Sequence, residues 1–181
     1  MNSDNIQIAR PKATGVFFAA PAGTALPADA TTALASAFVE CGYVSEDGIV
    51  ESVDDTNEVL KEMGGAPVLD LKTATEITYK LTPLEVLTYN VMCLLVGAAN
   101  CTKNAQDELV SVTLNGSEAP SNVIVFDMRL RGGKYMRVVI PNGHIAEVGD
   151  VTYKAGAAIA PELTIACYPD SSGNYVYKYI G

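Results

Sequence analysis

The chain has 181 residues, of which 49% are hydrophobic and 18% charged, and its net charge at pH 7 is −9. This length fits one domain or two small ones, and a core of this size needs no disulfide or metal to hold it. The apolar fraction excludes an intrinsically disordered chain. The acidic balance argues against a compact module that grips nucleic-acid phosphates, because such modules are basic. A surface with so few charges is expected to be covered in part by partners.

The sequence lacks the motifs of catalysis and of metal binding. It contains one histidine, and its four cysteines are widely spaced with no CxxC pair, so nothing favours a zinc site or a thioredoxin-like motif. Phosphate-binding loops and nucleophile elbows are missing too. We therefore expect no enzyme and no cofactor. No signal peptide is visible and no apolar run could span a bilayer, so we expect a cytosolic fold with reduced thiols and no membrane contact.

The N-terminal part of the chain predicts only short elements. Residues 1–13 are polar and are expected to form an arm. Residues 14–20 are apolar and end at a proline, which predicts a short strand. Residues 28–38 are rich in alanine and place apolar side chains four positions apart, which is consistent with a short helix.

The most acidic part of the chain follows. Residues 46–62 hold seven acids and one lysine, a net charge of −6. Glycines and a proline over 64–67 end this stretch and are expected to form a loop. The acids are Glu46, Asp47, Glu51, Asp54, Asp55, Glu58 and Glu62. They lack the alternating spacing of a calcium loop, and their mutual repulsion predicts a segment that is mobile in a free subunit.

A change of period marks the next two elements. Residues 69–81 alternate apolar and polar side chains, which predicts a long half-buried strand. A capping box with proline at the first helical position comes next, formed by Thr82, Pro83 and Glu85. Apolar residues then recur at helical spacing up to a glycine stop, which predicts a helix over about 83–96. Its stripe is expected to place both Leu87 and Leu94 in the core.

A hairpin with a predictable register follows the helix. A three-residue loop over 132–134 would set Leu130 opposite Met136 and leave one face wholly apolar, whereas a two-residue loop would mix the faces. Basic residues gather at this tip, namely Arg129, Arg131, Lys134 and Arg137. We expect these side chains to be solvated or to pair with acids of a neighbouring subunit.

The remaining segments complete a mainly β pattern. A turn is expected at 141–143, and further strands are expected at 109–114, 148–153, 163–168 and 175–180. Eight or nine strands with one well-marked helix indicate an α+β, mainly β fold. We expect an antiparallel β-sandwich or barrel with one flanking α-helix, formed as a single domain over residues 1–181.

Several segments together resemble a known family. They are RPKATG at 10–15, APAGTALP at 20–27, GYVSEDG at 42–48 and VVIPNG at 138–143. In this order, with a helix between the strands, they resemble major tail tube proteins of long-tailed phages (siphoviruses) of Gram-positive hosts, and the layout is similar to the lambda-type tail tube domain. The resemblance covers nearly the whole chain.

The resemblance implies a structural protein of the virion tail, made in the cytoplasm of the host bacterium. Subunits of this family join as hexameric rings that stack into a tube. The implied partners are further copies of the chain, the tape measure protein, the tail tip or initiator protein and the tail terminator protein, with DNA only in transit. The family's lumen is typically acidic, and its long inter-strand loop often reaches the next ring. Residues 46–67 occupy that place, so the resemblance implies an acidic inter-strand loop whose acids face either the lumen or a neighbouring ring.

Two other interpretations stay open. One is a different tail or secretion-tube protein of related fold, such as a tail terminator. The other is a carbohydrate-binding β-sandwich, a class that usually shows an exposed aromatic platform. The chain has no tryptophan, although Tyr175, Tyr177 and Tyr179 offer a tyrosine face.

Overall fold

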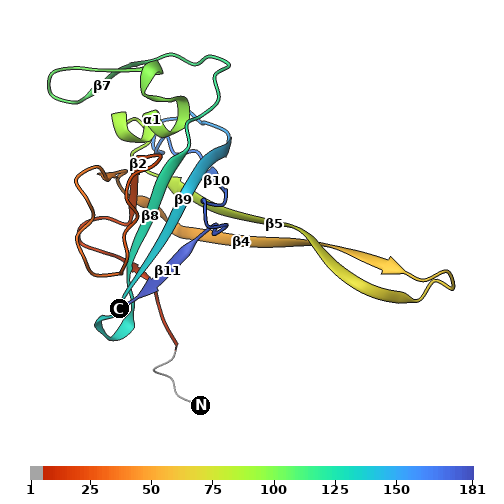
Figure 1. Cartoon of the computed structure of the whole chain (residues 1–181). Helices are drawn as coiled ribbons and strands as arrows, with labels where there is room; N and C mark the ends of the chain where they lie inside the picture. The colour runs from red at the N-terminus through yellow and green to blue at the C-terminus, as the bar shows by residue number, and fades with distance from the viewer. Residues whose placement is uncertain (1–5) are drawn as a thin grey trace.

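The protein is built around one antiparallel sheet of nine strands (Figure 1). Its structure is a computed structural model that describes residues 6–181. The path of the large sheet runs β3-β2-β8-β9-β10-β5-β4, with β1 beside β8 and β11 beside β9. The strands of this sheet are β1 (Arg10–Pro11), β2 (Phe17–Pro21), β3 (Val39–Glu40), β4 (Val44–Lys61), β5 (Pro67–Pro83), β8 (Asn122–Arg129), β9 (Tyr135–Val148), β10 (Leu163–Cys167) and β11 (Tyr177–Ile180).

Few elements lie outside this sheet. The short strands β6 (Cys101–Lys103) and β7 (Leu109–Val112) pair with each other, and one α-helix, α1 (Tyr89–Val96), precedes them within the described residues. Two single-turn 3₁₀ helices, η2 (Ala98–Asn100) and η3 (Arg131–Gly133), complete the set. The predicted mainly β, antiparallel class with one helix is therefore confirmed.

The core lies on both faces of the central strands β8 and β9. The run of four apolar residues at 123–126 is fully buried, because elements cover it from either side. On one face Phe126 packs against Phe17 and Tyr79, with ring centroids 5.7 and 5.5 Å apart, and α1 closes this side. The loop between β2 and β3 and the tyrosines of β11 cover the other face.

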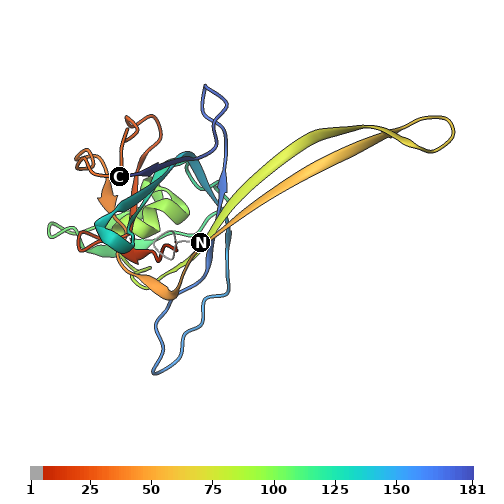
Figure 2. The same cartoon turned by 90° about the horizontal axis from the view of Figure 1, so that it is seen from below.

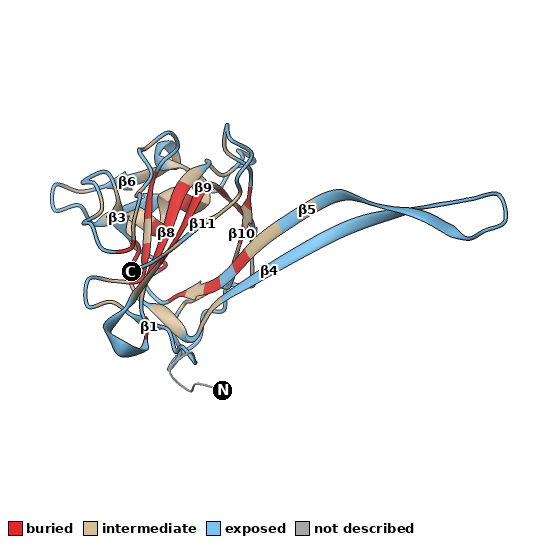
Figure 3. Cartoon of the chain, turned by 60° about the horizontal axis from the view of Figure 1, so that its bottom comes forward, coloured by how far each residue is buried: buried red, intermediate tan, exposed pale blue. Residues whose placement is uncertain are grey.

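Strands β4 and β5 leave the body as a long two-stranded hairpin (Figures 1 and 2). Every residue from 50 to 74 is exposed, as Figure 3 shows for the ribbon beyond its base. The predicted acidic loop at 46–67 is therefore wrong: all but its tip is strand. The alternation at 69–81 does form a strand, but only its end near the body is buried, because no other element covers the outer half.

Helix α1 begins six residues later than the capping box predicts. Strand β5 continues through Pro83, which pairs with Val44, and the Leu84 amide donates to the Tyr43 carbonyl at 2.8 Å. The Glu85 carboxylate accepts from the Tyr43 amide at 3.3 Å instead of capping a helix. Thr82, Pro83 and Glu85 thus form the end of a strand and a turn, and Thr88 is the N-cap residue. The predicted stop at Gly97 is confirmed.

Because α1 begins later than predicted, only one of the two leucines expected in the core is buried. Leu94 is 4% exposed, whereas Leu87 lies in the turn before the helix and is 56% exposed. We expect Leu94→Ala to lower the free energy of unfolding by about 2–5 kcal/mol, because it removes packed methyl groups and leaves a cavity. Leu87→Ala is the matched control and should change it by less than about 0.5 kcal/mol. Urea unfolding of both variants tests this, and equal losses would contradict the observed burial.

The N-terminal region differs from its predicted elements in two places. Residues 28–38 form turns instead of a helix, because the Asp29 carboxylate accepts from the backbone and hydroxyl groups of Thr31 and Thr32. These hydrogen bonds, those from Thr32 above all, hold the pKa of Asp29 well below its usual range. The predicted arm is in part a strand, since β1 pairs with β8; its residues 1–5 lie outside the described residues. The strand predicted at 14–20 is confirmed as β2.

The β8–β9 hairpin has the predicted faces but a longer loop. Met128 stands opposite Met136 and Arg129 opposite Tyr135, so five residues close the hairpin instead of three. The register is shifted by two residues, which leaves the same side chains on each face. Residues 141–143 do not turn, because Gly143 pairs with both neighbouring strands within β9.

The later strands are mostly those that the sequence predicts. The strands predicted at 109–114, 163–168 and 175–180 are found as β7, β10 and β11, whereas the one predicted at 148–153 is wrong, because β9 ends at Val148 and the chain then runs irregularly to β10. The four cysteines are free. Burial raises the pKa of the Cys41 thiol to about 12, which keeps it protonated and unreactive.

Candidate assembly surfaces

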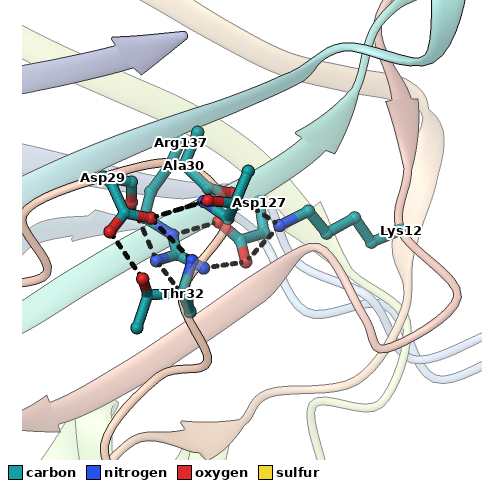
Figure 4. A network of polar contacts seen from close by, with 7 residues as sticks. Lys12, Asp29, Ala30, Thr32, Asp127 and Arg137 are labelled. Atoms are coloured by element: carbon teal, nitrogen blue, oxygen red, sulfur yellow. Dashed lines mark hydrogen bonds and ion pairs between the residues drawn. The ribbon is translucent and has the colours of Figure 1, made fainter. Parts of the chain in front are cut away.

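A buried ion pair joins the two central strands on the face covered by the β2–β3 loop (Figure 4). Asp127 and Arg137 stand directly opposite each other in β8 and β9 and are 3% and 2% exposed. The guanidinium donates two hydrogen bonds to the carboxylate, at 2.6 and 2.8 Å. This two-pronged geometry is the strongest form of such a pair and satisfies both carboxylate oxygens.

The same pair holds the neighbouring loops on the sheet. Arg137 also donates to the backbone carbonyls of Asp29 and Thr32, both at 2.9 Å. Lys12 donates to Asp127 at 3.0 Å and to the Ala30 carbonyl at 3.1 Å. The network therefore fixes the β2–β3 loop and the segment after β1 against the central hairpin. Its role is structural, because both carboxylate oxygens of Asp127 and each nitrogen of the Arg137 guanidinium are hydrogen-bonded within one chain.

The sequence predicts that Arg137 belongs to an exposed basic tip. This prediction is wrong, because Arg137 is buried. The alternation placed it on a solvent face, but that face also carries Val123 and Val125, which are buried. Apolar residues on both sides of a strand indicate that both faces are covered, and a charge there must be paired. This signal was available in the sequence and pointed to a buried pair.

The other predicted basic residues do lie together at one end of the body. Arg129, Arg131 and Lys134 are exposed around the loop that joins β8 to β9. Sequence reasoning missed Arg10, which stands directly opposite Arg129 in the β1–β8 pair. A surface cavity of about 420 Å³ opens here, and its lining includes Ile8 and Leu130 besides the three arginines. We name this surface the arginine end.

The predicted acids do not form one cluster but follow the hairpin from base to tip. Glu46 and Asp47 lie beside the body, Glu62 lies in the tip turn, and the others are spread along β4 between them. All seven are exposed, so none is held in a buried site.

The acids on one face of the hairpin form ion pairs, whereas those on the other face do not. On the face that continues the Tyr79 side, Glu51 pairs with Lys178 and Asp55 pairs with Lys72, both at 2.6 Å. The Lys72 ammonium and the Thr75 hydroxyl hold the pKa of Asp55 below its usual range. The opposite face carries Asp54, Glu58 and Glu76. Among the described residues no ion pair involves these three carboxylates.

A bulge in β5 determines which leucines share that second face. Thr56 pairs with Ala74 but Asn57 pairs with Lys72, so Thr73 is the extra residue and β5 exchanges its faces there. Three leucines beyond the bulge consequently lie on the side of Asp54 and Glu58. They are Leu60, Leu69 and Leu71, with 58%, 49% and 48% of their surface exposed. We name this side of the hairpin, with its three carboxylates and three leucines, the leucine face.

The two tyrosines of β11 pack on the body and are partly buried. Tyr177 and Tyr179 stack with ring centroids 6.3 Å apart and pack against the buried valines of the β8–β9 face. The Tyr177 hydroxyl is engaged by Asp170 at 2.6 Å. No three metal-ligating side chains gather within residues 6–181, and no helix there is long and apolar enough to cross a membrane.

A small body with an exposed ribbon that carries uncovered leucines defines a protein that associates with further chains. The family model for phage tail tube proteins matches residues 1–181, and the chain belongs to this family. It is a structural protein of the virion tail and not an enzyme, and tail tube proteins self-assemble. No curated protein matches the sequence.

Proposed function

We propose that the chain is the major tail tube protein of a long-tailed phage of the lambda type. Copies form hexameric rings, and the rings stack into a conduit through which DNA passes at ejection. The tape measure protein occupies the lumen before ejection, and the tail tip and tail terminator proteins bind the two ends. The expectation of one tail-tube-like domain over residues 1–181 is part of this proposal. The observation that carries it is the projecting β4–β5 hairpin of a family member.

The hairpin supports assembly because a free two-stranded ribbon is marginal in water. Its outer part, from Glu51 to Lys61 in β4, reaches roughly 35 Å from the body at about 3.3 Å per residue. That reach is about the width of a small domain. A neighbouring subunit placed under the ribbon covers its leucines and supplies the support that this chain does not.

The acidic balance supports a conduit for DNA. If residues 46–62 recur in six copies, the net −6 of that segment becomes about −36, spread along the six hairpins. Acids that face the lumen would repel DNA phosphates and prevent sticking. The paired acids, Glu51 and Asp55, and the leucine face lie on opposite sides of the ribbon, so one side can meet a neighbour while the other meets solvent.

Assembly of the purified protein tests the proposal. Sedimentation velocity over a range of concentrations, with and without a tail initiator complex, should show rings or longer polymers. A ring that never stacks would favour a tail terminator. A monomer under every condition, including the initiator, would contradict the proposed tube.

A further inference from the structure

We propose that the contact between copies is made by two particular surfaces: the leucine face of one hairpin docks on the arginine end of the next subunit. This inference rests on the proposed function and names the partner surface of the hairpin. The occupant of each surface is a second copy of this chain.

The first observation is a like-charge pair on the hairpin. Asp54 and Glu76 stand directly opposite each other across β4 and β5, and both are exposed. Carboxylates in this position repel each other and destabilise a sheet. By contrast, the neighbouring residue Asp55 is neutralised within the chain by an ion pair with Lys72. The leucine face therefore carries negative charge that no basic side chain of the described residues neutralises through an ion pair.

The second observation is a like-charge pair of the opposite sign on the body. Arg10 and Arg129 stand directly opposite each other across β1 and β8. No ion pair within residues 6–181 includes either of them. Two guanidinium groups in this position also repel each other. Each surface thus holds a repulsive pair that the other surface would neutralise.

The apolar groups of the two surfaces match as well. The leucine face ends in Leu60, Leu69 and Leu71 beyond its acids. The arginine end surrounds a cavity of about 420 Å³ that Ile8 and Leu130 help to line, and Ile8 is 56% exposed. Docking would bury apolar surface on both sides and place carboxylates beside guanidinium groups, which sets register as well as affinity.

The positions of the two surfaces favour a head-to-tail contact. The arginine end lies at the loop between β8 and β9, at the lower end of the body in Figure 1, whereas the hairpin projects sideways from the β5–β4 edge of the sheet. A contact between unlike surfaces passes from one copy to the next and generates closed rings or continuing stacks. Two leucine faces would instead bring six carboxylates together, so a symmetric hairpin dimer is disfavoured.

Charge exchange tests the inference. We expect Glu76→Lys and Arg129→Glu each to raise the protein concentration needed for assembly by about tenfold or more, because each places like charges across the contact. The double variant should recover assembly to within about threefold of the natural chain, since it restores one opposite-charge pair. Asp70→Lys is the matched control: it makes the same charge change on the same strand but on the other face, and it should leave assembly unchanged.

The stability of the monomer supplies a second measurement. Each single variant converts a repulsive cross-strand pair into an attractive one, so its thermal midpoint should stay the same or rise while its assembly falls. A folding defect would instead lower both. Single variants that assemble like the natural chain, or a double variant as defective as the singles, would overturn the docking but leave the tube proposal intact. Failure of the natural chain itself to assemble would contradict both.

Discussion

Asp127→Ala should lower the free energy of unfolding by about 3–5 kcal/mol, the cost of leaving a buried charge without its partner. Arg137, which is 2% exposed in the natural chain, would lose two of its four hydrogen bonds. Domains of this kind are stable by about 5–15 kcal/mol, so this one change removes a large part of the total. The loss should appear in urea unfolding as a lower midpoint.

Two comparisons separate this effect from a general loss of charge. Asp107→Asn breaks the exposed Lys103–Asp107 pair, at 2.6 Å, and keeps a side chain that tolerates the positive φ of 64° at this position, so it should leave the midpoint unchanged because solvent screens that pair. Replacing Asp127 and Arg137 together by leucine and methionine should cost less than the single change, since the fully buried guanidinium is removed with its partner and only the Lys12 ammonium, whose side chain is 13% exposed, then loses an ion pair. An Asp127→Ala midpoint equal to that of the natural chain would show that the network does not support the fold.

Removing the outer hairpin should abolish assembly while the body still folds. Val53 and Ile77 stand opposite each other at the point where the ribbon leaves the sheet. Replacing residues 54–76 by an Asn-Gly turn closes the two strands with a common two-residue connection. Almost all the removed residues are exposed, so the thermal midpoint should fall by no more than a few degrees. Sedimentation should then show monomers at every concentration.

Two results would contradict this prediction. An unfolded variant would show that the ribbon is part of the folding unit and not an appended connector. Rings or tubes formed at the usual concentration would show that subunits join through other surfaces. Circular dichroism together with sedimentation distinguishes these results.

The class of fold could be predicted from the sequence because strands of the body are covered on at least one face. Burial imposes alternation, and the alternating or apolar runs at β2, β8 and β10 are found where they are expected. Strand β4 is exposed on both faces from residue 50 outward in a single copy, so that part carries no such alternation. A fully exposed strand and a polar loop look alike in composition.

Other differences arise from contacts that are distant in sequence. Thr82 and Glu85 match the sequence pattern of a capping box, but β5 continues its pairing with β4 up to Pro83, so the helix begins later in the chain. Arg137 becomes buried only because a loop about 105 residues away folds over it, through the Thr32 carbonyl. The arginine end combines β1 with the β8–β9 loop, which no short sequence window contains.

Cryo-electron microscopy of the assembled protein tests the central claim most directly. The account predicts stacked sixfold rings in which each β4–β5 hairpin crosses to a neighbouring subunit, with Leu60 and Leu69 covered and Glu76 near an arginine of the next chain. A tube in which the hairpins lie against their own bodies, or extend freely into solvent, would contradict it.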